Sequence, residues 1–173
     1  VCSLFDSVYL SFYRGIGGIA GAILAGDSEF IEKSRVWKRR YGGDLISLYP
    51  YIIPADYYFE LRSQKMGQYY EAAKELAELF NSCYGISTRP QVPVSNMFHV
   101  HFPFPKEKVE AVLAEVQQET GLGITSYVKE VDEKGCYFEL SLGDQYRNVP
   151  KTEIKKAFLL LNQRMTQQFC CKE

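Results

Sequence analysis

The sequence has neither a strong excess of charge nor a long apolar run. Its 173 residues carry 20 Lys and Arg against 21 Asp and Glu, a formal net charge of -1. Because it lacks both an acidic tail and a basic stripe, nucleic acid is not an expected partner. No window of about 18 uncharged apolar residues occurs, so the sequence predicts a soluble protein without a membrane span.

Metal-binding patterns and paired cysteines are also scarce. The two histidines, His99 and His101, share one face of a predicted strand and could bind Zn²⁺ or Fe²⁺. No Asp, Glu or Cys stands beside them at ligand spacing, so we predict no metal site. The five cysteines lack CxxC spacing and are odd in number. This pattern fits a reducing cytosol, and we expect a cytoplasmic protein.

Aromatic residues are abundant, with 13 Tyr, 11 Phe and 1 Trp. Large rings and Tyr hydroxyls suit either a packed domain with partly polar pockets or an extended interface. Apolar residues make up 46% and charged residues 24%, which is ordinary for a globular chain of one or two domains. The chain starts at Val1 and shows no signal peptide, and we expect it to be part of a longer protein.

The first part of the chain predicts two short buried strands joined by a glycine turn. Residues 6–13 are aromatic and β-branched, four glycines follow between positions 15 and 21, and residues 22–25 are apolar again. A helix is expected over residues 29–40, with Asp27 or Ser28 as its cap and basic residues in its last turn.

The second part predicts an α+β arrangement, a small antiparallel sheet covered by helices on one side. Connecting helices are expected between residues 45 and 82, with Pro50 and Pro54 breaking or starting turns and a long amphipathic helix around residues 66–80. Pro90 and Pro93 then mark a boundary. The later elements are a strand at 96–102, a helix at 105–120, a hairpin formed by 124–131 and 136–142, and a helix at 149–169.

Three chemical motifs have ordinary structural explanations. Residues 15–20 match the GxGxxA dinucleotide fingerprint, but a Rossmann turn should open a helix at once, so a tight turn between strands is favoured. No GxSxG elbow or family-type Cys context supports a Ser or Cys nucleophile. The cluster Lys38, Arg39 and Arg40 could hold a phosphate or carboxylate, or it could be the usual solvated helix end.

Residues 5–26, FDSVYLSFYRGIGGIAGAILAG, resemble the pyridoxal-phosphate lysine segment of the threonine aldolase and β-eliminating lyase family. The likeness continues through WKRRYGG at 37–43. The resemblance implies an aspartate-aminotransferase-like enzyme of fold type I, α/β overall, whose small domain is α+β. Residues 1–44 would form the end of its large cofactor-binding domain. Residues 45–94 would form the connecting helices, and residues 95–173 would form the small C-terminal domain.

The same resemblance implies an amino-acid lyase of the aldolase or β-eliminating type, with pyridoxal phosphate at a dimer interface. Ser11, Tyr13, Gly15 and Arg39 would lie near the cofactor, and Arg14 stands at the position of the family's Schiff-base lysine. The family's upstream aspartate and phosphate-binding turn have no counterpart in these residues. We therefore expect a homo-oligomer, or association with a missing N-terminal part.

Arg14 is the most consequential departure from the family. A guanidinium stays protonated and is a poor nucleophile, so we expect this chain to be inactive. Arg14 was introduced, or belongs to a natural paralogue, or the register differs by one residue, although no lysine lies between Val1 and Glu32. The resemblance also implies an arginine shortly after the glycine run, where this chain has Leu45. It implies a substrate-facing arginine near the last strand, where this chain has Tyr137 or a neighbour.

Two alternatives stay open. The chain could be a catalytically silent structural or dimerising module of the same fold. It could also be an unrelated α+β domain that binds a small molecule or metal, which would be favoured if residues 8–25 did not form two neighbouring strands.

Overall fold

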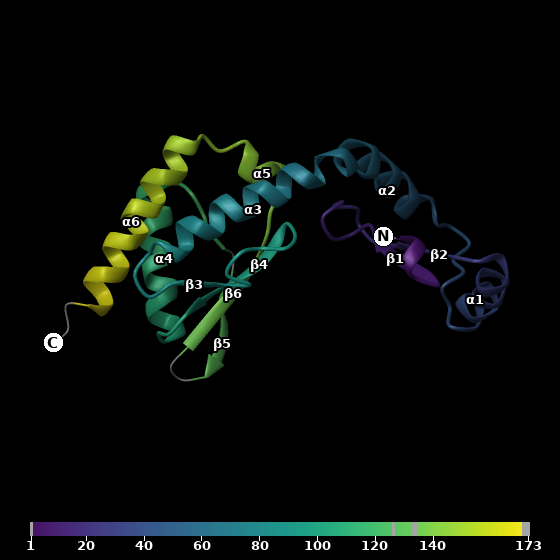
Figure 1. Ribbon diagram of the computed structural model, residues 1–173, viewed down its shortest axis with the longest axis horizontal. Coiled ribbons are helices and arrows are strands. Elements are labelled where there is room, and N and C mark those ends of the chain that lie inside the picture. The colour runs from purple at the N-terminus through teal and green to yellow at the C-terminus, as the bar shows by residue number, and fades with distance from the viewer. Residues whose placement is uncertain (1, 126, 133–134, 171–173) are drawn as a thin grey trace. The chain divides into compact units, whose positions relative to one another are not determined.

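A computed structural model describes residues 2–125, 127–132 and 135–170, which belong to two compact units divided between Met66 and Gly67 (Figure 1). No described helix combines the length and apolar character needed to cross a bilayer. The expected domain limits at residues 44 and 94 refer to a whole family member and stay a prediction. The first unit contains η1 (Cys2–Leu4), β1 (Ser7–Ser11), β2 (Ala22–Gly26), α1 (Ser28–Arg40), α2 (Tyr49–Arg62) and η2 (Ser63–Lys65). The remaining elements are α3 (Met66–Asn81), β3 (Ser87–Arg89), β4 (Met97–Phe102), α4 (Lys106–Thr120), β5 (Lys129–Asp132), β6 (Gly135–Ser141), α5 (Asp144–Arg147) and α6 (Lys151–Phe169).

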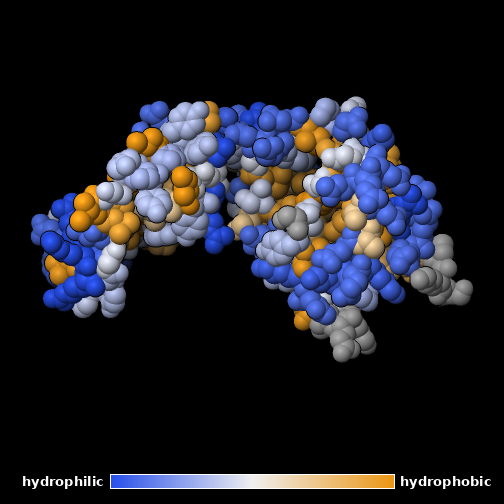
Figure 2. Space-filling model, turned by 180° about the vertical axis from the view of Figure 1, so that it is seen from behind, coloured by the Kyte–Doolittle hydropathy of each residue, from blue (hydrophilic) through white to orange (hydrophobic). Residues whose placement is uncertain are grey.

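In the first unit, β1 and β2 form an antiparallel pair in which Tyr9 lies opposite Leu24. This confirms the two strands joined by a glycine turn and contradicts the Rossmann turn. The condition that would have favoured an unrelated domain is therefore not met. The prediction that the strands are buried is wrong, because all five residues of β2 are exposed. A sheet of two strands leaves most of its side chains open to solvent, and Figure 2 shows hydrophobic residues at the surface of this unit.

Helix α1 begins after the predicted capping residue Asp27. The Asp27 carboxylate accepts a hydrogen bond of 2.8 Å from the backbone N–H of Phe30, and the last turn carries three basic residues. The helices expected after residue 45 are present as α2 and α3, and the 3₁₀ turn η2 separates them. The tighter hydrogen bonding of a 3₁₀ turn interrupts the α-helical ladder there.

The second unit is built on a four-stranded antiparallel sheet in the order β3-β4-β6-β5. Alternate residues of β4 and β6 are buried on one face, against α3, α4 and α6: Phe98, Val100, Phe102, Cys136 and Phe138. This confirms the predicted small sheet with helices on one side. Glu133 and Lys134, in the turn of the predicted hairpin, lie outside the described residues. The short elements β3 and α5 were not predicted, because three or four residues carry too little periodicity.

Phe80 of α3 lies at the centre of this core and is fully buried. Its ring centroid lies 4.7 Å from that of Phe158 on α6, and 6.3 and 6.0 Å from those of Phe98 and Phe138. All three contacts are edge-to-face, the arrangement that aromatic quadrupoles favour. One side chain therefore joins two helices to both central strands.

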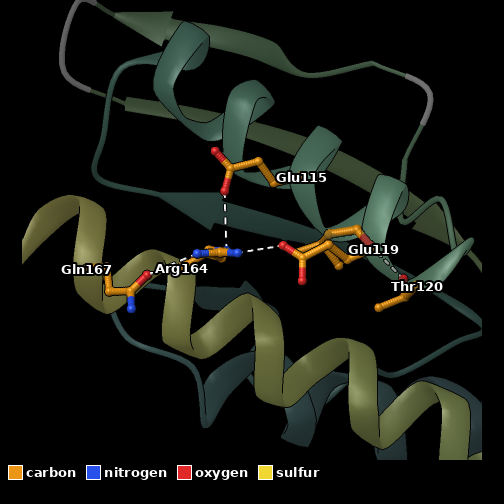
Figure 3. Close-up of polar contacts among 6 residues, drawn as sticks. Glu115, Glu119, Thr120, Arg164 and Gln167 are labelled. Atoms are coloured by element: carbon orange, nitrogen blue, oxygen red, sulfur yellow. Dashed lines mark hydrogen bonds and ion pairs between the residues drawn. The ribbon is translucent and has the colours of Figure 1, made fainter.

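At the surface of the second unit, Arg164 of α6 forms polar contacts with the neighbouring helix α4 (Figure 3). Its Nη2 donates a hydrogen bond of 2.5 Å to Glu119 Oε1, and its Nε lies 3.3 Å from Glu115 Oε2 without hydrogen-bond geometry. Arg164 Nη1 also donates to Gln167 within α6. The planar guanidinium on α6 thus interacts with two carboxylates on α4.

Replacing Phe80 by Ala should destabilise the second unit severely. The substitution leaves a cavity among three rings, so the free energy of unfolding should fall by about 3–5 kcal/mol. Urea unfolding followed by far-ultraviolet circular dichroism measures the change. Leu159 lies in α6 and is 74% exposed, so Leu159→Ala serves as a control. It should change stability by no more than about 0.5 kcal/mol. Equal losses in the two variants would contradict the central place of Phe80.

Replacing Arg164 by Gln should lower the urea midpoint, and the loss should shrink when salt is added. The interaction is electrostatic and partly exposed, so about 1 M NaCl screens most of it. Lys155→Gln removes an exposed positive charge from the same helix and should leave the midpoint nearly unchanged. A salt-independent loss in Arg164→Gln would mean that packing, rather than charge, joins α4 to α6.

Candidate functional site

The glycine turn between β1 and β2 is closed by its own backbone. The N–H of Gly18 donates to the Phe12 carbonyl at 2.7 Å, and the N–H of Gly17 donates to the Arg14 carbonyl at 2.9 Å. Gly17 and Gly21 have φ values of 80° and 99°, which L side chains rarely adopt. The turn therefore requires glycine at these two positions.

Helix α2 supports the turn from the same unit. Arg62 Nη1 donates a 2.8 Å hydrogen bond to the carbonyl of Ile16, and a Cβ at Gly17 would lie 2.1 Å from that same nitrogen. The Phe12 and Phe59 rings meet edge to face with centroids 6.2 Å apart. Arg62 was not predicted as a site residue, because no sequence signal connects it with a turn 46 residues earlier.

Arg14 lies in the turn with its side chain exposed, beside two tyrosines. Its guanidinium carbon is 5.7 Å from the ring centroid of Tyr13, and the Tyr13 and Tyr9 hydroxyls are 3.4 Å apart. The hydrogen bond with Tyr9, aided by Arg14, lowers the pKa of Tyr13, and the same hydrogen bond raises the pKa of Tyr9. The cluster is thus polarised around one fixed positive charge.

The other predicted site residues lie on two elements. Ser11 ends β1 opposite Ala22 and is half-buried, and Gly15 follows Arg14 in the turn. Arg39 lies apart from them in the last turn of α1, where it is exposed and its carbonyl accepts from the N–H of Gly42 at 3.1 Å. The hairpin segment therefore brings Ser11, Tyr13, Arg14 and Gly15 together by chain proximity, and Arg39 comes from a separate helix.

The chemistry available at the turn is that of a cation and phenols. A guanidinium and a phenol can bind an anion through charge and hydrogen bonds, but neither is an amine that can attach covalently to an aldehyde. Segment 2–32 contains no lysine. These residues consequently do not fit covalent attachment of pyridoxal phosphate.

Other nucleophile and metal chemistry is poorly supported in the described parts of the chain. Burial raises the pKa of the Cys83 and Cys136 thiols to about 11, so both stay protonated at neutral pH. Among the described residues, no group of three His, Cys, Asp or Glu side chains could hold a metal ion. His99 instead lies 3.2 Å from a single carboxylate, that of Glu139.

Comparison with known proteins extends these observations beyond the turn. A profile of the beta-eliminating lyase family matches residues 1–103, more than half of the chain. The low-specificity L-threonine aldolase of Candida albicans is 28% identical over 142 residues, 81% of this chain and 36% of that protein. Threonine aldolases thus resemble the chain in both of its units.

Two crystal structures match almost the whole chain. A proposed L-allo-threonine aldolase from Listeria monocytogenes is 56% identical with a TM-score of 0.90. A proposed aromatic amino acid beta-eliminating lyase/threonine aldolase from Exiguobacterium sp. is 54% identical with a TM-score of 0.89. Each match covers 94% of this chain but only 45% or 46% of the other, so the chain spans less than half their length. The resemblance seen in the sequence is confirmed, and the chain belongs to the threonine aldolase and beta-eliminating lyase family.

Proposed function

We propose that this chain is part of a pyridoxal-phosphate-dependent type of lyase for amino acids in which Arg14 blocks covalent attachment of the cofactor. The names of the two similar crystal structures support an amino acid as the substrate class. The observation that carries the proposal is the glycine turn, in which Gly17 and Gly21 have positive φ and Arg14 presents an exposed guanidinium at the position where the resemblance implies an amine. The protein would be silent in the lyase reaction.

The proposal keeps Ser11, Tyr13, Gly15 and Arg39 as neighbours of a cofactor bound without a covalent bond. Arg14 would contribute positive charge, and Tyr13, with its lowered pKa, would be a strong hydrogen-bond donor to a phosphate. A cytoplasmic location fits the described cysteines, none of which is in a disulfide. The partner would be a second copy, or the part of the family fold without a counterpart in this chain.

The test is to restore the amine. In a protein of the relatives' full length that carries residues 1–173, Arg14→Lys should gain pyridoxal phosphate at position 14. Borohydride reduction followed by peptide mass spectrometry detects that attachment, and the Arg14 protein should show none in this segment. The reason is that only an amine can react with the aldehyde of the cofactor.

Nonspecific labelling of exposed lysines needs a matched control. Arg35 is exposed on α1, outside the turn, so Arg35→Lys adds an equivalent amine elsewhere in the unit. Labelling at position 14 should far exceed labelling at position 35 at limiting cofactor. Equal labelling at the two positions, or none at position 14, would refute the proposal.

A second candidate function is a silent association module, and one observation favours it. The first unit exposes large apolar side chains on its hairpin and on both helices, more than an isolated soluble domain normally carries. They include Tyr9, Leu24, Val36, Trp37, Ile52, Ile53 and Tyr57, each between 43% and 63% exposed. Such a surface suits an interface, and this candidate predicts that full-length Arg14→Lys still lacks lyase activity.

A charge placed on the hairpin should break that association. Leu24 is 43% exposed on β2, so Leu24→Glu would bury a carboxylate without a partner in any interface formed there. Sedimentation velocity should show a shift from oligomer toward monomer. Val94→Glu, at a position that is 83% exposed in the second unit, should leave the sedimentation coefficient unchanged. A monomeric parent chain, or an unchanged Leu24→Glu oligomer, would exclude this interface.

A further inference from the structure

The face of the second unit's sheet opposite the aromatic core carries polar and ionisable side chains. Strand register sets them in two rows, one running Ser87, His101, Tyr137 and Lys129 and the other Arg89, His99 and Glu139. The His101 and Tyr137 rings stack with centroids 5.2 Å apart and planes 12° apart. This face belongs neither to the core nor to the glycine turn.

A groove of about 480 Å³ opens at one end of this face. Its polar lining includes Ser87, Arg89 and His101, and its apolar lining includes Ile86, Phe102 and Val131. The volume falls within the range typical of sites for small organic ligands. Ile86 and Phe102 are buried, so Val131 is the apolar side chain of this set that a ligand could contact, beside the convergent polar groups.

His101 is the unusual member of the lining. Its Nε2 is buried and has no hydrogen-bond partner among the described residues, a costly state for a polar atom. Burial, followed by the positive charges of Arg89 and His99, lowers the pKa of His101. A negatively charged group in the groove would relieve both conditions, since it would accept a hydrogen bond and offset the positive potential.

The charges on the outer face of the sheet favour an anion beside Arg89 and His101, whereas Glu107, Glu110 and Glu130 act on Cys136 at another part of the groove lining. No hydrogen bond or ion pair involving the exposed Arg89 side chain is found among the described residues, and Lys129 Nζ lies 5.8 Å from the Tyr137 ring centroid. The carboxylate that faces the same rows, Glu139, is engaged by His99 at 3.2 Å. The charged or titratable groups facing His101 are therefore Arg89 from β3, His99 from β4, Tyr137 and Glu139 from β6, and Lys129 from β5.

We propose that this groove binds a small organic oxyanion, a carboxylate or a phosphate ester, through Arg89, His101 and Ser87, with its organic body beside the exposed Val131 side chain. Arg89 supplies a bidentate fork for the oxyanion. His101 supplies a donor once its ring reorients or becomes protonated. The inference does not rest on the lyase proposal, because no residue of the glycine turn takes part.

The test uses benzoate and phenyl phosphate as probes, with benzyl alcohol as the uncharged control. The three share an aromatic body, so a difference among them reports the oxyanion. Nuclear magnetic resonance of the histidine rings in the full chain should show saturable shifts of His101 with one or both anions, and a raised His101 pKa at saturation. By linkage, affinity should rise as pH falls through the pKa of His101.

Arg89→Gln should weaken anion binding roughly tenfold or more, because it removes a charged hydrogen-bond donor. Arg147→Gln, at an exposed arginine on α5, is the matched control and should bind as the parent does. Saturation by benzoate alone assigns a carboxylate, and saturation by phenyl phosphate alone assigns a phosphate ester. No saturation with either anion, equal saturation with benzyl alcohol, or full affinity in a folded Arg89→Gln chain would overturn the proposal.

Discussion

Along β4 the chain reads Met97, Phe98, His99, Val100, His101 and Phe102, and successive side chains leave the sheet on opposite faces. The three apolar members of this alternation meet Phe80 and the helices, and the two histidines meet solvent and the polar residues of the neighbouring strands. A slip of one residue in register would exchange the two faces. The core and the proposed anion groove therefore depend on the same strand register.

A different constraint shapes the first unit. The space beside Gly17 is filled by the guanidinium of Arg62, and the turn takes backbone angles that favour glycine. The turn is thus fixed by its own glycines and by one long-range hydrogen bond from α2. This arrangement holds residue 14 in the turn of the hairpin through contacts that do not involve its side chain.

Family membership implies a covalently bound cofactor, whereas the side chain at position 14 cannot form that bond. The match to the family and to two crystal structures extends through both units. In the proposed function Arg14 stands where the resemblance implies a reactive amine, and a guanidinium would keep the positive charge but could not undergo the same reaction. A fold can persist after such a change, because the turn depends on Gly17, Gly21 and Arg62 rather than on the side chain of residue 14.

The sequence alone was sufficient for the hairpin, the cap of α1, the one-sided sheet and the family, because each has a local signal such as alternation, a capping Asp27 or a glycine pattern. It was insufficient for the exposure of β2, for the break at η2 and for the support of the turn by Arg62. Those features depend on which distant residues cover a surface or reach a carbonyl. The groove likewise depends on tertiary structure. Arg89 and His101 come onto one face of the sheet only when β3 pairs with β4, and His101 Nε2 is then buried without a hydrogen-bond partner among the described residues.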